Sequence, residues 1–109
     1  MKYAEVQESW LEDVDTDSGL IYCITEYIER RGTKTLAEIC RELGPRYIRL
    51  RVSQDKIGWR RFMEGVISKE IIALQQQFLI VHGSETGLTK WSTGLITGLL
   101  EIVYGQWLY

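Results

Sequence analysis

Histidine and cysteine are scarce in this sequence. His82 is the only histidine among 109 residues, and Cys23 and Cys40 are the only cysteines. A zinc site needs about four ligands, so these residues do not supply one within the chain. Two buried thiols are the simplest interpretation of the cysteines, and a disulfide is the alternative. The sequence predicts no metal and no cofactor.

Catalytic motifs are also lacking. The sequence has no phosphate-binding Gly-x-x-x-x-Gly-Lys loop and no Gly-x-Ser-x-Gly nucleophile elbow. His82 precedes Gly83 and Ser84, which indicates a helix end more than a general base. Asp15 and Asp17 offer carboxylates to a cation, but two carboxylates in a turn usually form a solvated loop. We therefore expect no catalytic residues and no enzymatic activity.

Targeting and membrane-spanning segments are not expected. Residues 1–10 have no apolar run of the kind found in secretory signal peptides. Residues 88–107 contain Glu101 and Gln106, which are costly inside a bilayer. We expect an intracellular location, cytoplasmic or nuclear, and no membrane partner.

Charge, by contrast, is abundant and unevenly distributed. Residues 1–29 contain eight acidic residues and one lysine, whereas residues 30–61 contain ten basic and three acidic residues. The length favours a single domain over residues 1–109. The acidic residues 1–17 are a candidate for a loosely packed arm of that domain. The basic middle is the strongest indication of a ligand.

Helical periodicity dominates the rest of the sequence. Asp17 or Ser18 is placed to cap one helix, and Thr35 with Glu38 forms a capping box for the next. The predicted helices cover residues 2–14, 20–31, 35–43, 53–81 and 88–107. The predicted fold class is mainly α, a small bundle of four to five helices.

Residues 46–52 depart from this pattern. Ile48, Leu50 and Val52 alternate with polar residues, which predicts a short extended segment near 46–52. No second strand is available to pair with it, so an extended connector or a helical turn remains open.

The two longest predicted helices should pack antiparallel, because the connector between them is short. Gly94 and Gly98 are predicted helix-packing residues, since glycine allows another helix backbone to come close. Their predicted partner is the helix over 20–31, with a second copy of the chain as the alternative. The predicted mutual core is Trp59, Phe62, Val66, Trp91, Leu95 and Leu99.

The basic segment is the candidate nucleic-acid-binding site. Arginine side chains match phosphate geometry, and aromatic rings stack on bases. The candidate residues are Arg46, Tyr47, Arg49, Arg51, Lys56, Arg60 and Arg61, with Trp59 interleaved. A partner protein is the other candidate ligand. Alternatively, the basic residues have no ligand. They would then form a solvated helix face whose positive charge is neutralised by the acidic N-terminal third of the chain.

Residues 35–44 also resemble the first helix and turn of a helix-turn-helix, with Ala37 as a small residue and Gly44 at the turn. The second helix would then cover residues 45–56 and place Arg46 and Arg49 in the major groove. A DNA-binding domain is therefore a second hypothesis. A purely structural helical domain that self-associates is a third.

Several motifs in the second half have a family resemblance. They are Gln54-Asp55-Lys56-Ile57-Gly58-Trp59, Phe62-Met63-Glu64-Gly65 and Ser68-Lys69-Glu70, followed by Gly87, Trp91 and Gln106-Trp107. Together they resemble the C-terminal region of retrotransposon-encoded reverse-transcriptase proteins of microbial eukaryotes, over about residues 45–109. The resemblance implies a retroelement remnant. The paired-aspartate motif of the polymerase is absent, so no polymerase activity is expected. In that family a basic stretch follows the Gln-Trp pair, so we expect this chain to be truncated.

Overall fold

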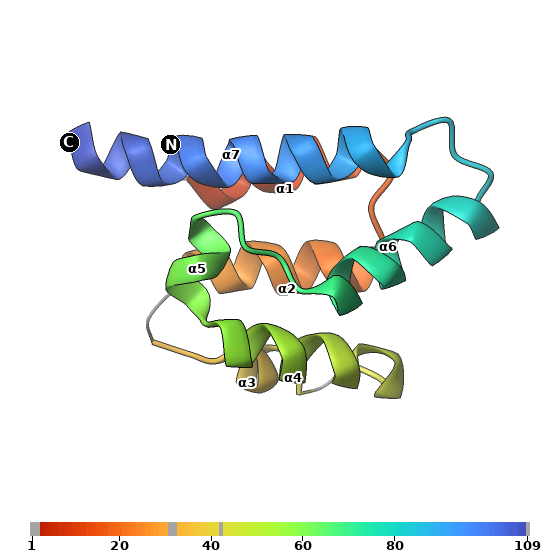
Figure 1. Cartoon of the computed structure of the whole chain (residues 1–109), viewed down its shortest axis with the longest axis horizontal. Helices are drawn as coiled ribbons and strands as arrows, with labels where there is room; N and C mark the ends of the chain where they lie inside the picture. The colour runs from red at the N-terminus through yellow and green to blue at the C-terminus, as the bar shows by residue number, and fades with distance from the viewer. Residues whose placement is uncertain (1–2, 31–32, 42, 109) are drawn as a thin grey trace.

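Seven α-helices and one 3-10 helix make up the computed structural model, which describes residues 3–30, 33–41 and 43–108. Figure 1 shows α7 with α1 beside it along one edge, α2 across the middle, and α3 with α4 at the opposite edge. No strand occurs in these residues, so the predicted mainly α fold is confirmed. The elements are α1 (Tyr3–Asp13), α2 (Ser18–Glu29), α3 (Leu36–Ile39), η1 (Pro45–Tyr47), α4 (Ile48–Ile57), α5 (Trp59–Met63), α6 (Lys69–Val81) and α7 (Leu88–Leu108).

The extended segment predicted near 46–52 is wrong, because these residues are helical in η1 and α4. Pro45 begins η1, where its fixed φ and missing N–H suit a first helical turn. Leu50 and Gln54 are buried one turn apart, whereas Ile48 and Val52 are exposed. The alternation in the sequence is therefore a coincidence, and the buried positions follow the helical period.

The single helix predicted over 53–81 is also wrong. Gly58 and Gly65 have φ of 96° and 93°, values that glycine adopts without strain and that end a helix. They separate α4, α5 and α6, so the count exceeds the predicted four to five helices. Ser68 then starts α6 by accepting a hydrogen bond from the Glu70 N–H at 3.0 Å.

The core is formed by apolar side chains from every α-helix. Of the six residues predicted to be mutually buried, four are buried: Phe62, Trp91, Leu95 and Leu99. Trp59 is half-buried, and Val66 is 45% exposed because it lies in the loop after α5. Leu11 of α1 is fully buried, so the acidic N-terminal region is a packed helix and not a loose arm.

Gly94 and Gly98 of α7 lie against α1. A Cβ atom at Gly94 would collide with the indole of Trp10, and one at Gly98 would collide with the side-chain amide of Gln7. The glycines therefore allow a close approach within one chain. Its partner is α1 and not the predicted helix over 20–31.

The turn between α1 and α2 joins distant parts of the chain. Gln75 of α6 accepts a hydrogen bond from the Asp17 N–H at 3.1 Å and donates to the Asp15 carbonyl at 2.8 Å. The indole N–H of Trp91 donates to the Thr16 hydroxyl at 2.9 Å. Because Asp17 is only 3% exposed, the expected solvated loop is wrong there. The turn is a structural junction between α2, α6 and α7.

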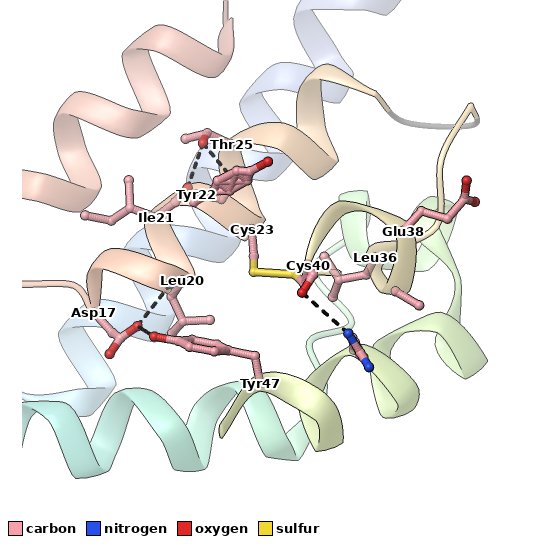
Figure 2. Close-up of a disulfide and its surroundings, with 12 residues drawn as sticks. Asp17, Leu20, Ile21, Tyr22, Cys23, Thr25, Leu36, Glu38, Cys40 and Tyr47 are labelled. Atoms are coloured by element: carbon pink, nitrogen blue, oxygen red, sulfur yellow. Dashed lines mark hydrogen bonds between the residues drawn. A yellow bond between two sulfur atoms is a disulfide. The ribbon is translucent and has the colours of Figure 1, made fainter. Parts of the chain in front are cut away.

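Cys23 and Cys40 form a disulfide that joins α2 to the end of α3, with 6.2 Å between their Cα atoms (Figure 2). Both residues are buried, as expected, but the expectation of two free thiols is wrong. Locally, α3 starts as predicted, because Thr35 and Glu38 form the capping box. In addition, the Asp55 carboxylate accepts from the N–H groups of Leu36 and Ala37 at 2.8 and 2.9 Å. The disulfide and Asp55 thus hold α3 at both ends.

Candidate nucleic-acid interface

Helix α4 presents basic residues on its outer face. Arg49 and Lys56 are both exposed and lie seven residues apart, so they share a face two turns apart. Val52 lies between them and is 49% exposed. Neither basic side chain has an ion-pair partner among the residues that the structure describes. Arg49 and Lys56 are therefore available to an anionic ligand.

Arg46 and Tyr47, by contrast, are engaged by the protein itself. An Arg46 guanidinium nitrogen lies 2.9 Å from one carboxylate oxygen of Asp17, and the Tyr47 hydroxyl donates to the other oxygen at 2.7 Å. Figure 2 shows the ring of Tyr47 reaching from the η1 turn to Asp17 at the start of α2. Burial, and then the hydrogen bond to Asp17, raise the pKa of Tyr47 to about 12. Tyr47 therefore has a structural role, because its hydroxyl is held by Asp17.

Arg51 also has a structural role. Its guanidinium donates to the Cys40 carbonyl at 3.4 Å and the side chain is half-buried. The same carbonyl, at the C-terminal end of α3, also accepts the Leu43 N–H at 3.0 Å, so Arg51 is its second and more distant donor. Arg46, Tyr47 and Arg51 are thus engaged by other protein groups, which makes them less available to a ligand than Arg49 and Lys56.

Arg60 and Arg61 occupy the short helix α5 directly after the Gly58 break. Both are exposed, and the Arg60 guanidinium lies 5.5 Å from the ring centre of Trp59. This distance is typical of a cation–π contact. Trp59 is half-buried, so part of its ring reaches the surface. Trp59 is interleaved with the predicted contact residues but was not itself predicted to be one, although its position next to two arginines was a visible signal.

Acidic side chains barely oppose this surface. Asp55 is the only acidic residue in 45–61, and both of its carboxylate oxygens accept backbone N–H groups of α3. The exposed basic residues of α4 and α5 outnumber the acidic residues of this segment, and none of them forms an ion pair with a described residue. We call the surface that they form the α4–α5 surface; its residues are Arg49, Lys56, Arg60 and Arg61.

Within the described ranges, no group of three or more His, Cys, Asp or Glu side chains gathers around a common point. None of the described helices combines the length and hydropathy that crossing a bilayer requires.

Comparison with known proteins gives no family assignment. No protein family, no curated protein and no solved structure matches this chain. The resemblance to retroelement proteins therefore stays an expectation from the sequence.

Proposed function

We propose that this chain is a non-enzymatic helical module that contacts nucleic acid through the α4–α5 surface. The observation that carries the proposal is the exposure of Arg49, Lys56, Arg60 and Arg61 without acidic partners in the described part of the chain. Phosphates attract such side chains and release counterions when they bind, which makes the affinity depend on salt. The retroelement resemblance supports the same function from the sequence side.

Salt dependence of binding tests this proposal. Fluorescence anisotropy with labelled single-stranded and duplex oligonucleotides should show binding at low salt that weakens as salt rises. Replacing Lys56 by Gln should lower the slope of log affinity against log salt by about 0.7 on a single strand and about 0.9 on a duplex, since one phosphate contact is lost. The double variant Arg49→Gln/Lys56→Gln should lower it about twice as much.

Lys90→Gln is the matched control. Lys90 is also an exposed lysine, and it lies in the first turn of α7, at the opposite edge of the molecule from α4 (Figure 1). Its replacement changes the net charge by the same amount and should leave the slope unchanged. Absence of binding at low salt, or equal slopes for both lysine variants, would refute the proposal.

A partner protein is the second candidate ligand. Ile48 and Val52 are 43% and 49% exposed on the helix that carries Arg49. An acidic amphipathic segment would cover both the aliphatic and the basic side chains of such a face. A chain that binds no nucleic acid would favour this candidate.

The helix-turn-helix alternative has less support from the geometry. Helix α3 has only four residues, and Gly44 at the turn has φ of −65°, so no left-handed turn residue is used there. A self-associating structural domain is the remaining alternative, and sedimentation of the wild type separates it from a monomer.

We also propose an intracellular location, which follows from the sequence alone. The Cys23–Cys40 disulfide weighs against a reducing compartment, because disulfides persist mainly in oxidising ones. Alkylation of the protein in freshly lysed cells distinguishes paired from free thiols. Free thiols would support the intracellular location, and paired cysteines would contradict it.

A further inference from the structure

A hollow lies directly beside the α4–α5 surface. It has a volume of about 200 Å³ and is bounded by the segment 33–35 on one side and by Gly58 and Trp59 on the other. Tyr27 and Asp55 also line it. The hollow therefore lies at the junction of α4 and α5, and Trp59 in its wall directly precedes the exposed Arg60 and Arg61 in the chain.

One wall of this hollow is the half-buried ring of Trp59. The guanidinium of Arg60 lies over that ring at 5.5 Å, so aromatic surface and positive charge adjoin. Single-stranded nucleic acid is bound by this combination, in which a base stacks on an aromatic ring while basic side chains follow the phosphates.

The polar groups of the hollow decide which part of a nucleotide fits. Asp55 and Glu38 both line it, and hydrogen bonds from Thr35 lower the pKa of Glu38, so its carboxylate stays ionised. Two carboxylates repel a phosphate, and Lys34, which also lines the hollow, offsets only one of the two charges. The carboxylates accept hydrogen bonds from a neutral ring with N–H groups, since each carboxylate oxygen of Asp55 accepts one backbone N–H from the described residues and has room for a second donor.

We infer that the ligand of the α4–α5 surface is single-stranded nucleic acid, with one unpaired base in the hollow against Trp59 and its neighbouring phosphates on Arg60 and Arg61. The inference rests on the function proposed above and narrows it. In a duplex each base is stacked and paired inside the helix, and taking it out costs several kcal/mol. A single strand presents its bases without that cost.

The test compares three ligands of equal length with the wild-type chain: a single strand, a strand of the same backbone with abasic sites, and a duplex. Stacking of one base on a tryptophan should make the base-containing strand bind roughly five- to 150-fold more tightly than the abasic strand. Trp59→Leu should abolish this difference and leave the abasic strand unaffected. Trp59→Phe, which keeps an aromatic ring, should retain most of it.

The outcomes separate the two proposals. Equal binding of base-containing and abasic strands by the wild type, or tighter binding of the duplex, would overturn the inference while the phosphate contact still stands. No binding of any of the three would overturn both. The comparison of ligands on the wild-type chain needs no variant, so it decides the matter even if Trp59→Leu unfolds the protein.

Discussion

The hydroxyl of Tyr47 should contribute measurably to stability, because it bonds to a buried charge. It donates to an oxygen of Asp17 at 2.7 Å, and Asp17 is 3% exposed. The same oxygen accepts the Leu20 N–H at 3.1 Å, and Arg46 pairs with the second oxygen. Tyr47→Phe removes one of these three partners and leaves the others in place.

The expected loss is about 1.5–3 kcal/mol in the free energy of unfolding, the usual value of a hydrogen bond to a charged group. Urea denaturation followed by circular dichroism measures it, with an unchanged slope against urea as the sign of an intact fold. Tyr22→Phe is the matched control. Tyr22 is 45% exposed, so the same change should cost less than about 0.5 kcal/mol there.

A double-mutant cycle with Asp17→Ala assigns the loss to this bond. Asp17→Ala should cost more than Tyr47→Phe, because it also removes the N-cap of α2. The combined variant should be less destabilised than the sum of the two, with a coupling energy of about 0.5–3 kcal/mol. Strict additivity, or a Tyr47→Phe variant as stable as Tyr22→Phe, would refute the reasoning.

Three further predictions concern packing, pH and the disulfide. Gly94→Ala should destabilise the protein by about 1–3 kcal/mol in urea denaturation, because the rigid ring of Trp10 must move, whereas Gly98→Ala should be close to neutral since it faces only a flexible amide. Burial raises the pKa of Tyr27 and Tyr47 to about 12, so the unfolded state releases these protons first. The contribution of these two tyrosines to the unfolding free energy should therefore be constant below pH about 10 and fall between pH 10 and 12. Tyr47→Phe should lessen that fall in a pH series. Reducing the disulfide, whose cysteines are 17 residues apart, should lower the free energy of unfolding by about 3 kcal/mol, and a midpoint unchanged by reductant would contradict this.

Features that depend on neighbouring residues were predictable from the sequence. The cap at Asp17 and the capping box of Thr35 and Glu38 are as expected, because each bond spans three residues. The buried periodicity of α7 was predictable for the same reason, since Trp91, Leu95 and Leu99 follow one helical face. Local rules are sufficient where the partner is one turn away.

Features that depend on distant contacts were not predictable. Arg46 and Tyr47 looked like contact residues, but their partner Asp17 lies about thirty residues earlier in the chain. The extended prediction near 46–52 failed because alternation and helical period give similar patterns over a few residues. The breaks at Gly58 and Gly65 depend on positive φ, and a glycine in a helical pattern does not reveal its φ beforehand.

The junction at the α1–α2 turn also affects the order of events during synthesis. Its hydrogen bonds to Gln75, Ser84 and Trp91 span 58 to 75 residues, so none can form until the second half of the chain exists. At about 5–20 residues per second, translation takes roughly 4 to 15 s to add the last of these partners. During that interval the apolar faces of α1 and α2 have no cover from α6 and α7. We therefore expect chaperones to shield the apolar faces of the nascent chain until Trp91 emerges and closes the junction.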